Sequence, residues 1–157
     1  MKSLIEKALT ILNAVADRLQ SPFLQLVRLY WGWQFVETGW GKVNNIEKVT
    51  GFFTTLGIPF PGLNAHFVAG LELVGGILLI LGLAARPIGL MLSVNMIVAY
   101  ITADWEAVSS ALREPDKFVQ AAPFPFLWTS LMSLVFGAGS LSLDRWIASR
   151  KKTSEQP

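Results

Sequence analysis

The chain has no cysteine among its 157 residues, and its one histidine is His66. The lack of cysteine excludes disulfides, thiolate metal sites and dithiol redox relays. A single histidine excludes a haem or copper site built from several histidines of one chain. No glycine cluster follows a strand pattern, so a phosphate-binding loop is not indicated. We therefore predict no metal site within the chain.

Charge is also scarce. Charged residues make up 15% of the chain and hydrophobic residues 52%, whereas soluble domains average about 25% charged residues. The mean hydropathy is +0.47. The net charge of +2 does not indicate nucleic acid as a partner, and a small basic excess in a membrane protein usually reflects topology. The expected partner is the lipid bilayer.

Long apolar runs fill most of the remaining sequence, at residues 22–38, 64–83, 87–103 and 123–139. A helix needs about 20 mostly apolar residues to cross a bilayer, with ~17 as the lower limit. Pro22, Pro87 and Pro123 are typical of first helical positions. The sequence therefore predicts an all-α polytopic membrane protein with a bundle of four transmembrane helices.

The first 21 residues show a different pattern. Apolar residues recur there at helical spacing and charged or polar residues occupy much of the rest. We predict an amphipathic interfacial helix at 1–21; the alternative is a soluble helix packed under the bundle. The charged residues interrupt any signal-peptide core, so no cleavable signal is expected. A membrane domain at 22–146 and a basic cytoplasmic tail at 147–157 would follow.

Basic residues predict the orientation. The side of the bundle that holds both termini carries Lys2, Lys7, Arg18, Arg86, Arg145, Arg150, Lys151 and Lys152. The other side carries Lys42, Lys48, Arg113 and Lys117. The positive-inside rule therefore places both termini in the cytoplasm, in the inner (plasma) membrane of a bacterium.

Three polar residues lie inside the apolar runs: Arg28, Glu72 and Asn95. An ionisable group in hydrocarbon costs about 3 kcal/mol, so such groups are usually paired. At 1.5 Å per residue, Arg28, Asn95 and Glu72 would lie about 9, 12 and 18 Å from the cytoplasmic face. This favours a buried Arg28–Glu72 pair with Asn95 as third partner. The pair either fixes helix order or takes part in ligand or proton chemistry.

A second polar layer is expected at the outer ends of the helices. It contains the ligand-binding candidates Glu37, Lys42, His66, Tyr100 and Asp104. Apolar walls with a few convergent polar groups suit a planar ligand such as a quinone head group. The alternative is an interfacial belt, in which tryptophan and tyrosine are enriched without any ligand. His66 in particular fits a structural or interfacial role.

With these residues in view, the chain resembles the DoxX family of small bacterial membrane proteins over residues 22–146. The resemblance is carried by the segments 26–42, 70–86 and 137–144. Residues of the family pattern are Gly32, Gly39, Gly75, Gly76, Arg86, Gly137, Gly139, Ser142 and Asp144. The resemblance implies a four-helix membrane bundle linked to thiosulfate:quinone oxidoreductase, other membrane redox complexes or oxidative-stress defence. It also marks Arg28, Lys42 and Glu72 as important, but transfers no catalytic residue set.

Three functions are consistent with these features. The first is an accessory subunit of a quinone-linked or oxidative-stress-related membrane redox system, with a redox enzyme subunit as partner. Any enzymatic activity would then be that of an oxidoreductase acting with this partner. The second is a membrane scaffold or assembly factor without a redox ligand. The third is a small-molecule transporter, which would need a homo-oligomer because four helices are few to enclose a path.

Overall fold

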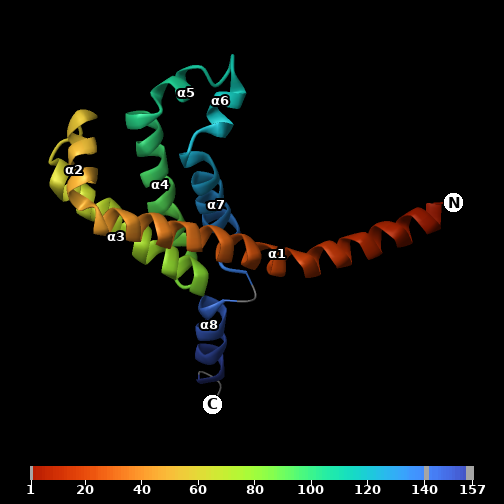
Figure 1. Ribbon diagram of the computed structural model, residues 1–157. Coiled ribbons are helices and arrows are strands. Elements are labelled where there is room, and N and C mark those ends of the chain that lie inside the picture. Colours follow the sequence, from red (N-terminus) through yellow and green to blue (C-terminus); the bar gives the residue numbers. More distant parts are fainter. Residues whose placement is uncertain (1, 140–141, 155–157) are drawn as a thin grey trace.

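The computed structural model describes residues 2–139 and 142–154. All regular structure in this part is helical (Figure 1), which confirms the predicted all-α class. The helices are α1 (Lys2–Asn44), α2 (Ile46–Thr55), α3 (Pro61–Leu81), α4 (Ala85–Ala103), α5 (Trp105–Ser109), α6 (Pro115–Gln120), α7 (Pro123–Phe136) and α8 (Leu143–Ser154). The predicted tail at 147–157 is helical as far as Ser154, and its last residues lie outside the described part.

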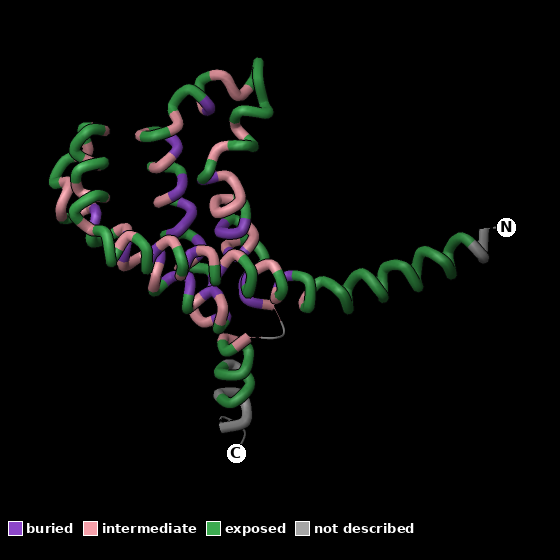
Figure 2. Tube along the Cα trace, in the orientation of Figure 1, coloured by how far each residue is buried: buried purple, intermediate pink, exposed green. Residues whose placement is uncertain are grey.

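The first helix differs from the prediction. α1 is one continuous helix of 43 residues with Pro22 in its interior, whereas the sequence predicted a break at Pro22 and an end near Thr38. Proline lacks the N–H that would bond the carbonyl of Arg18. Arg18 is exposed, so solvent can satisfy that carbonyl. The N-terminal half projects from the other helices, and residues 5–20 are all exposed (Figure 2).

Two helices, α3 and α4, are long and apolar enough to cross a membrane, with mean hydropathies of 1.7 and 1.3. α7 is also apolar but has only 14 residues. Large apolar side chains are exposed on the outer faces of these helices, among them Phe67, Val74, Ile77, Leu90, Val94, Ile97, Trp128 and Val135. An apolar surface of this extent is typical of contact with lipid.

Close helix packing surrounds a small core of Phe35, Leu79, Leu92 and Met96. α1 contacts α3 and α7, and α4 contacts the same two helices. Glycine permits the closest approaches. A Cβ on Gly76 would lie 2.7 Å from the carbonyl oxygen of Gly32 across the α1–α3 seam. A Cβ on Gly89 of α4 would lie 2.8 Å from the carbonyl oxygen of Ser130 in α7. Small residues thus let the backbones of neighbouring helices meet.

The turn between α3 and α4 is closed by a residue distant in sequence. Ala84 has a left-handed φ of 50°. The backbone N–H groups of Ala84 and Ala85 donate to the Asp144 carboxylate oxygens at 2.8 and 3.1 Å. Asp144 therefore satisfies amides at the start of α4 that have no partner within the helix.

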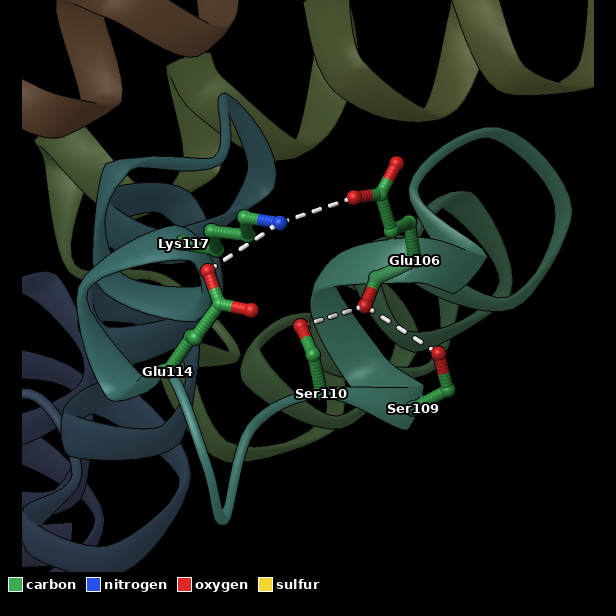
Figure 3. Close-up of polar contacts among 5 residues, drawn as sticks. All are labelled: Glu106, Ser109, Ser110, Glu114 and Lys117. Atoms are coloured by element: carbon green, nitrogen blue, oxygen red, sulfur yellow. Dashed lines mark hydrogen bonds and ion pairs between the residues drawn. The ribbon is translucent and has the colours of Figure 1, made fainter.

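The connection between α4 and α7 is held by polar contacts at its surface. The Nζ of Lys117 lies 2.9 Å from Glu106 Oε1 and 3.1 Å from Glu114 Oε2 (Figure 3). At the residue after Lys117, the carbonyl oxygen of Phe118 accepts a hydrogen bond from the hydroxyl of Tyr100 at 2.7 Å. Phe118 also stacks on the Tyr100 ring at 4.6 Å between centroids. These contacts fix the short helices over the end of α4.

This cluster should make the loop sensitive to acid. Hydrogen bonding to Lys117 lowers the pKa of Glu106 below its ordinary value of 4.5. The cluster therefore stabilises the loop fully above that ordinary value, and the contribution is lost as pH falls through the lowered pKa. We expect the protection of amides in α5 and α6, measured relative to their intrinsic exchange rates, to fall only in that acidic range. Lys117→Gln should remove this pH dependence and Lys48→Gln should not; an unchanged profile in Lys117→Gln would contradict the prediction.

Candidate functional site

A pocket of about 670 Å³ lies between the end of α1, α2, the α2–α3 loop, α3, α4 and the start of α7. Its walls are largely apolar, and three aromatic rings contribute to them: Phe52, Phe53 and Phe126. The pocket is within the range of about 300–1,000 Å³ that is typical of small-molecule sites. It is therefore the candidate binding site of the molecule.

An ion pair forms the polar part of this pocket. The Nζ of Lys42 contacts Oε2 of Glu72, and Nδ2 of Asn95 donates to Oε1 of Glu72 at 3.3 Å. The Glu72 side chain is 4% exposed, whereas that of Lys42 is 30% exposed. An ammonium group has three N–H donors. Lys42 thus neutralises the buried carboxylate and keeps donor capacity toward the pocket.

The approach of α1 to α3 positions this pair. A Cβ on Gly39 would lie 2.4 Å from the backbone nitrogen of Leu73, the residue after Glu72. Gly39 therefore lets α1 contact the α3 backbone directly, and Lys42 follows almost one helical turn later. Because the two helices are this close, the Lys42 side chain reaches the carboxylate without leaving the pocket wall.

Asp104 contributes a second polar group at the end of α4. It lies nine residues after Asn95, which corresponds to about 13 Å of helix. Apolar residues of α4, such as Val98 and Ala99, line the pocket between them. The pocket can therefore hold a mainly apolar molecule whose polar end meets the Lys42–Glu72 pair.

The predicted ligand-binding residues are only partly brought together. Lys42 and Asp104 line the pocket, whereas Glu37 and His66 are exposed and do not line it. The Nδ1 of His66 lies 2.8 Å from the carbonyl oxygen of Gly62, within its own helix. Tyr100 is buried under the α5–α6 loop and is not among the lining residues. Only part of the predicted outer layer thus belongs to the site.

The predicted buried pair also changes partner. Glu72 and Asn95 are bonded to each other as expected, but the cation on Glu72 is Lys42. Among the described residues, Arg28 forms no ion pair with Glu72; its guanidinium donates to Gln25 and lies beside Gly82. Gly82 is about 15 Å along α3 from Glu72.

The spacing of residues in the sequence contained a signal that Lys42 is available as a partner of Glu72, which the prediction did not use. Arg28, Gly32, Phe35, Gly39 and Lys42 recur at intervals of four and three residues, which places them on one helical face. The first four are buried and Lys42 is half-buried. No such signal pointed to Phe52 and Phe53, because the placement of α2 depends on tertiary contacts. Within the described residues, no group of three or more histidine, cysteine or acidic residues could hold a metal ion.

The chain is similar to a known protein family over residues that form this pocket. The DoxX family profile matches residues 23–105, a range that includes Lys42, Glu72, Asn95 and Asp104. "Putative oxidoreductase CatD" of Bacillus subtilis is 31% identical over 127 residues, which cover 81% of this chain and 88% of that protein. An uncharacterized protein of Haemophilus influenzae is 29% identical over 133 residues, covering 79% of this chain and 82% of that protein. No solved structure matches the chain.

Proposed function

Because the chain belongs to the DoxX family, we propose that this membrane protein is an accessory subunit of a quinone-linked or oxidative-stress-related redox system. The name of the Bacillus subtilis relative supports the redox class. The chain has no cysteine, so thiol chemistry would belong to a partner subunit. The chain itself would bind and orient the lipid-soluble redox molecule.

The pocket at Lys42 and Glu72 is the observation that supports this proposal. A quinone has a flat apolar ring with carbonyl oxygens that accept hydrogen bonds. The residues present fit such a group: aromatic and aliphatic walls surround the partly exposed Lys42 side chain. A bound quinone would supply the electron-accepting chemistry. Lys42 would hold a carbonyl oxygen, and its ion pair with Glu72 would keep its side chain in place.

The proposed topology has four membrane crossings, made by residues 22–44 of α1 together with α3, α4 and α7. At 1.5 Å per residue the 14 residues of α7 give about 21 Å, less than the ~30 Å of a typical hydrocarbon core. Local thinning of the bilayer can accommodate such a short helix. Both termini would lie in the cytoplasm of a bacterium.

In this topology the N-terminal half of α1 would reach the membrane surface by a bend at Pro22, because the continuous helix otherwise carries it along the line of the first crossing. Its apolar side chains Ile5, Leu9, Leu12 and Leu19 are more than half exposed. They share a wide helical face, opposite Asp17 and Thr10. A helix with one apolar and one polar face binds in the plane of the membrane interface. With such a bend, the arm would anchor the domain to the lipid head groups.

Filling the pocket tests the proposed ligand. Ala99 lines the pocket, so Ala99→Trp should displace a bound quinone. Val94→Trp is the matched control, because Val94 lies on the same helix, is 52% exposed and does not line the pocket. We expect solvent extraction and mass spectrometry of the gently solubilised protein to find quinone in the wild type and in Val94→Trp, and to find it depleted in Ala99→Trp.

Other results would favour the remaining functions. Absence of quinone from both the wild type and Val94→Trp would contradict the ligand proposal and favour a membrane scaffold. Proteins that co-purify would then become the next measurement. Solute flux into proteoliposomes, blocked by Ala99→Trp, would favour an oligomeric transporter.

A further inference from the structure

A second pocket, of about 440 Å³, lies between the start of α4, the end of α7 and the start of α8. Two arginines line it, Arg86 and Arg145, and both are exposed. Pocket and arginines are at the end of α4 opposite Asp104, and therefore away from the Lys42–Glu72 site. The site described above does not involve these residues.

The two guanidinium groups have donor capacity left. Within the described part of the chain, neither Arg86 nor Arg145 forms an ion pair. The carboxylate in the pocket, that of Asp144, already accepts hydrogen bonds from the amides of Ala84 and Ala85. The pocket thus offers guanidinium donors whose planar geometry matches a phosphate group.

The Arg86 side chain lies against the end of α7, beside Gly137. Gly137 ends α7 with φ of 71° and ψ of −156°, a conformation open essentially to glycine alone. A Cβ at this position would lie 3.4 Å from Nε of Arg86. That is ordinary van der Waals contact, so the glycine is required by its backbone conformation and not by the packing of Arg86.

Apolar surface adjoins the two arginines. Phe136 and Pro87 line the pocket, and Leu90 lies one turn further along α4. Phe136 and Leu90 are 52% and 51% exposed. A ligand held by both arginines would therefore have its phosphate at the end of the apolar helices and an alkyl chain against their sides. Basic pockets between transmembrane helices at the cytoplasmic face bind anionic lipid head groups in this way.

We propose that Arg86 and Arg145 form a binding site for the phosphate of an anionic phospholipid. The proposal rests on the membrane placement stated above and is independent of the quinone. Each arginine contributes on the order of a fivefold gain in lipid affinity. Phosphatidylglycerol should therefore bind preferentially over phosphatidylcholine at this corner of the protein.

Lipid retention tests the site. The protein is reconstituted in phosphatidylcholine bilayers that contain a minor fraction of phosphatidylglycerol, released gently, and analysed for bound lipid by native mass spectrometry. The wild type should retain phosphatidylglycerol selectively. The Arg86→Gln, Arg145→Gln double variant should lose this selectivity by on the order of tenfold or more. Lys48→Gln, Arg113→Gln is the control: it removes the same charge from exposed residues at the other end of the molecule.

Three results would overturn the proposal. Equal retention by the double variant and the wild type would exclude the two arginines. Equal loss in the control would show a general effect of net charge. Displacement of the lipid by inorganic phosphate at comparable concentration would show that the site takes phosphate alone. Because quinone content is measured separately on the same variants, failure of this site is distinguishable from failure of the proposed redox function.

Discussion

Replacing Gly39 by alanine is expected to lower the free energy of unfolding by about 2 kcal/mol or more. The added Cβ would lie 2.4 Å from the nitrogen and 2.8 Å from the Cα of Leu73. Backbone atoms inside a helix have no freedom to move aside, so α1 would have to shift away from α3. Lys42 would shift with it, and the ion pair with Glu72 would weaken. The variant should therefore lose both stability and pocket geometry.

Two other glycines serve as matched controls. A Cβ on Gly41, in the same helix, or on Gly70 in α3 would meet nothing within 4 Å. Alanine at either position should be neutral or should stabilise the helix by up to about 1 kcal/mol, because it restricts the unfolded chain. Denaturant unfolding in detergent, followed by circular dichroism, measures all three variants. Gly39→Ala with the stability of Gly41→Ala would contradict the close α1–α3 contact.

The second large effect on stability is expected when the cation of the Lys42–Glu72 ion pair is removed. Lys42→Met leaves the carboxylate of Glu72, 4% exposed, without its cation. Breaking a buried pair typically costs about 3–5 kcal/mol. Lys42 itself is 30% exposed, so solvent partly screens the interaction and we expect a loss of about 2–3 kcal/mol. Lys48→Met, which removes an exposed cation in α2, should change stability by less than about 0.5 kcal/mol.

The double variant separates structure from function. Lys42→Met with Glu72→Met removes both charges, so its stability should return to within about 1 kcal/mol of the wild type. Binding of a polar head group should nevertheless be lost, because the donors of Lys42 are gone. A stable double variant that still retains quinone would show that the pair only holds the helices together. A double variant less stable than either single one would contradict the pairing itself.

The predicted fold class follows from apolar runs long enough for helices, but helix ends were less predictable. Ser21-Pro22 has the pattern of a helix start, yet α1 continues through it. The same pattern is compatible with an exposed interior proline, because water can bond the carbonyl that proline leaves unpaired. Nothing local in the sequence distinguishes these two situations.

The candidate site was likewise only partly predictable from the sequence. Glu72 and Asn95 could be predicted as buried partners because polar groups inside apolar runs are usually paired. The cation could not be assigned by depth, since that arithmetic ended the first helix near Thr38 and placed Arg28 within reach. With α1 extending to Asn44, Lys42 lies on the helical face that contacts α3. Small differences in helix ends therefore decide which of two cations meets a buried carboxylate.

The Asp144 carboxylate has a consequence for where the folded unit ends. The family profile matches residues 23–105, but the acceptor for the first amides of α4 comes from residue 144. A chain shortened to residue 139 would keep every apolar helix and still lose this tie across the α3–α4 turn. Truncations should therefore be placed beyond Asp144, because the acceptor that closes the α3–α4 turn lies well past the matched segment.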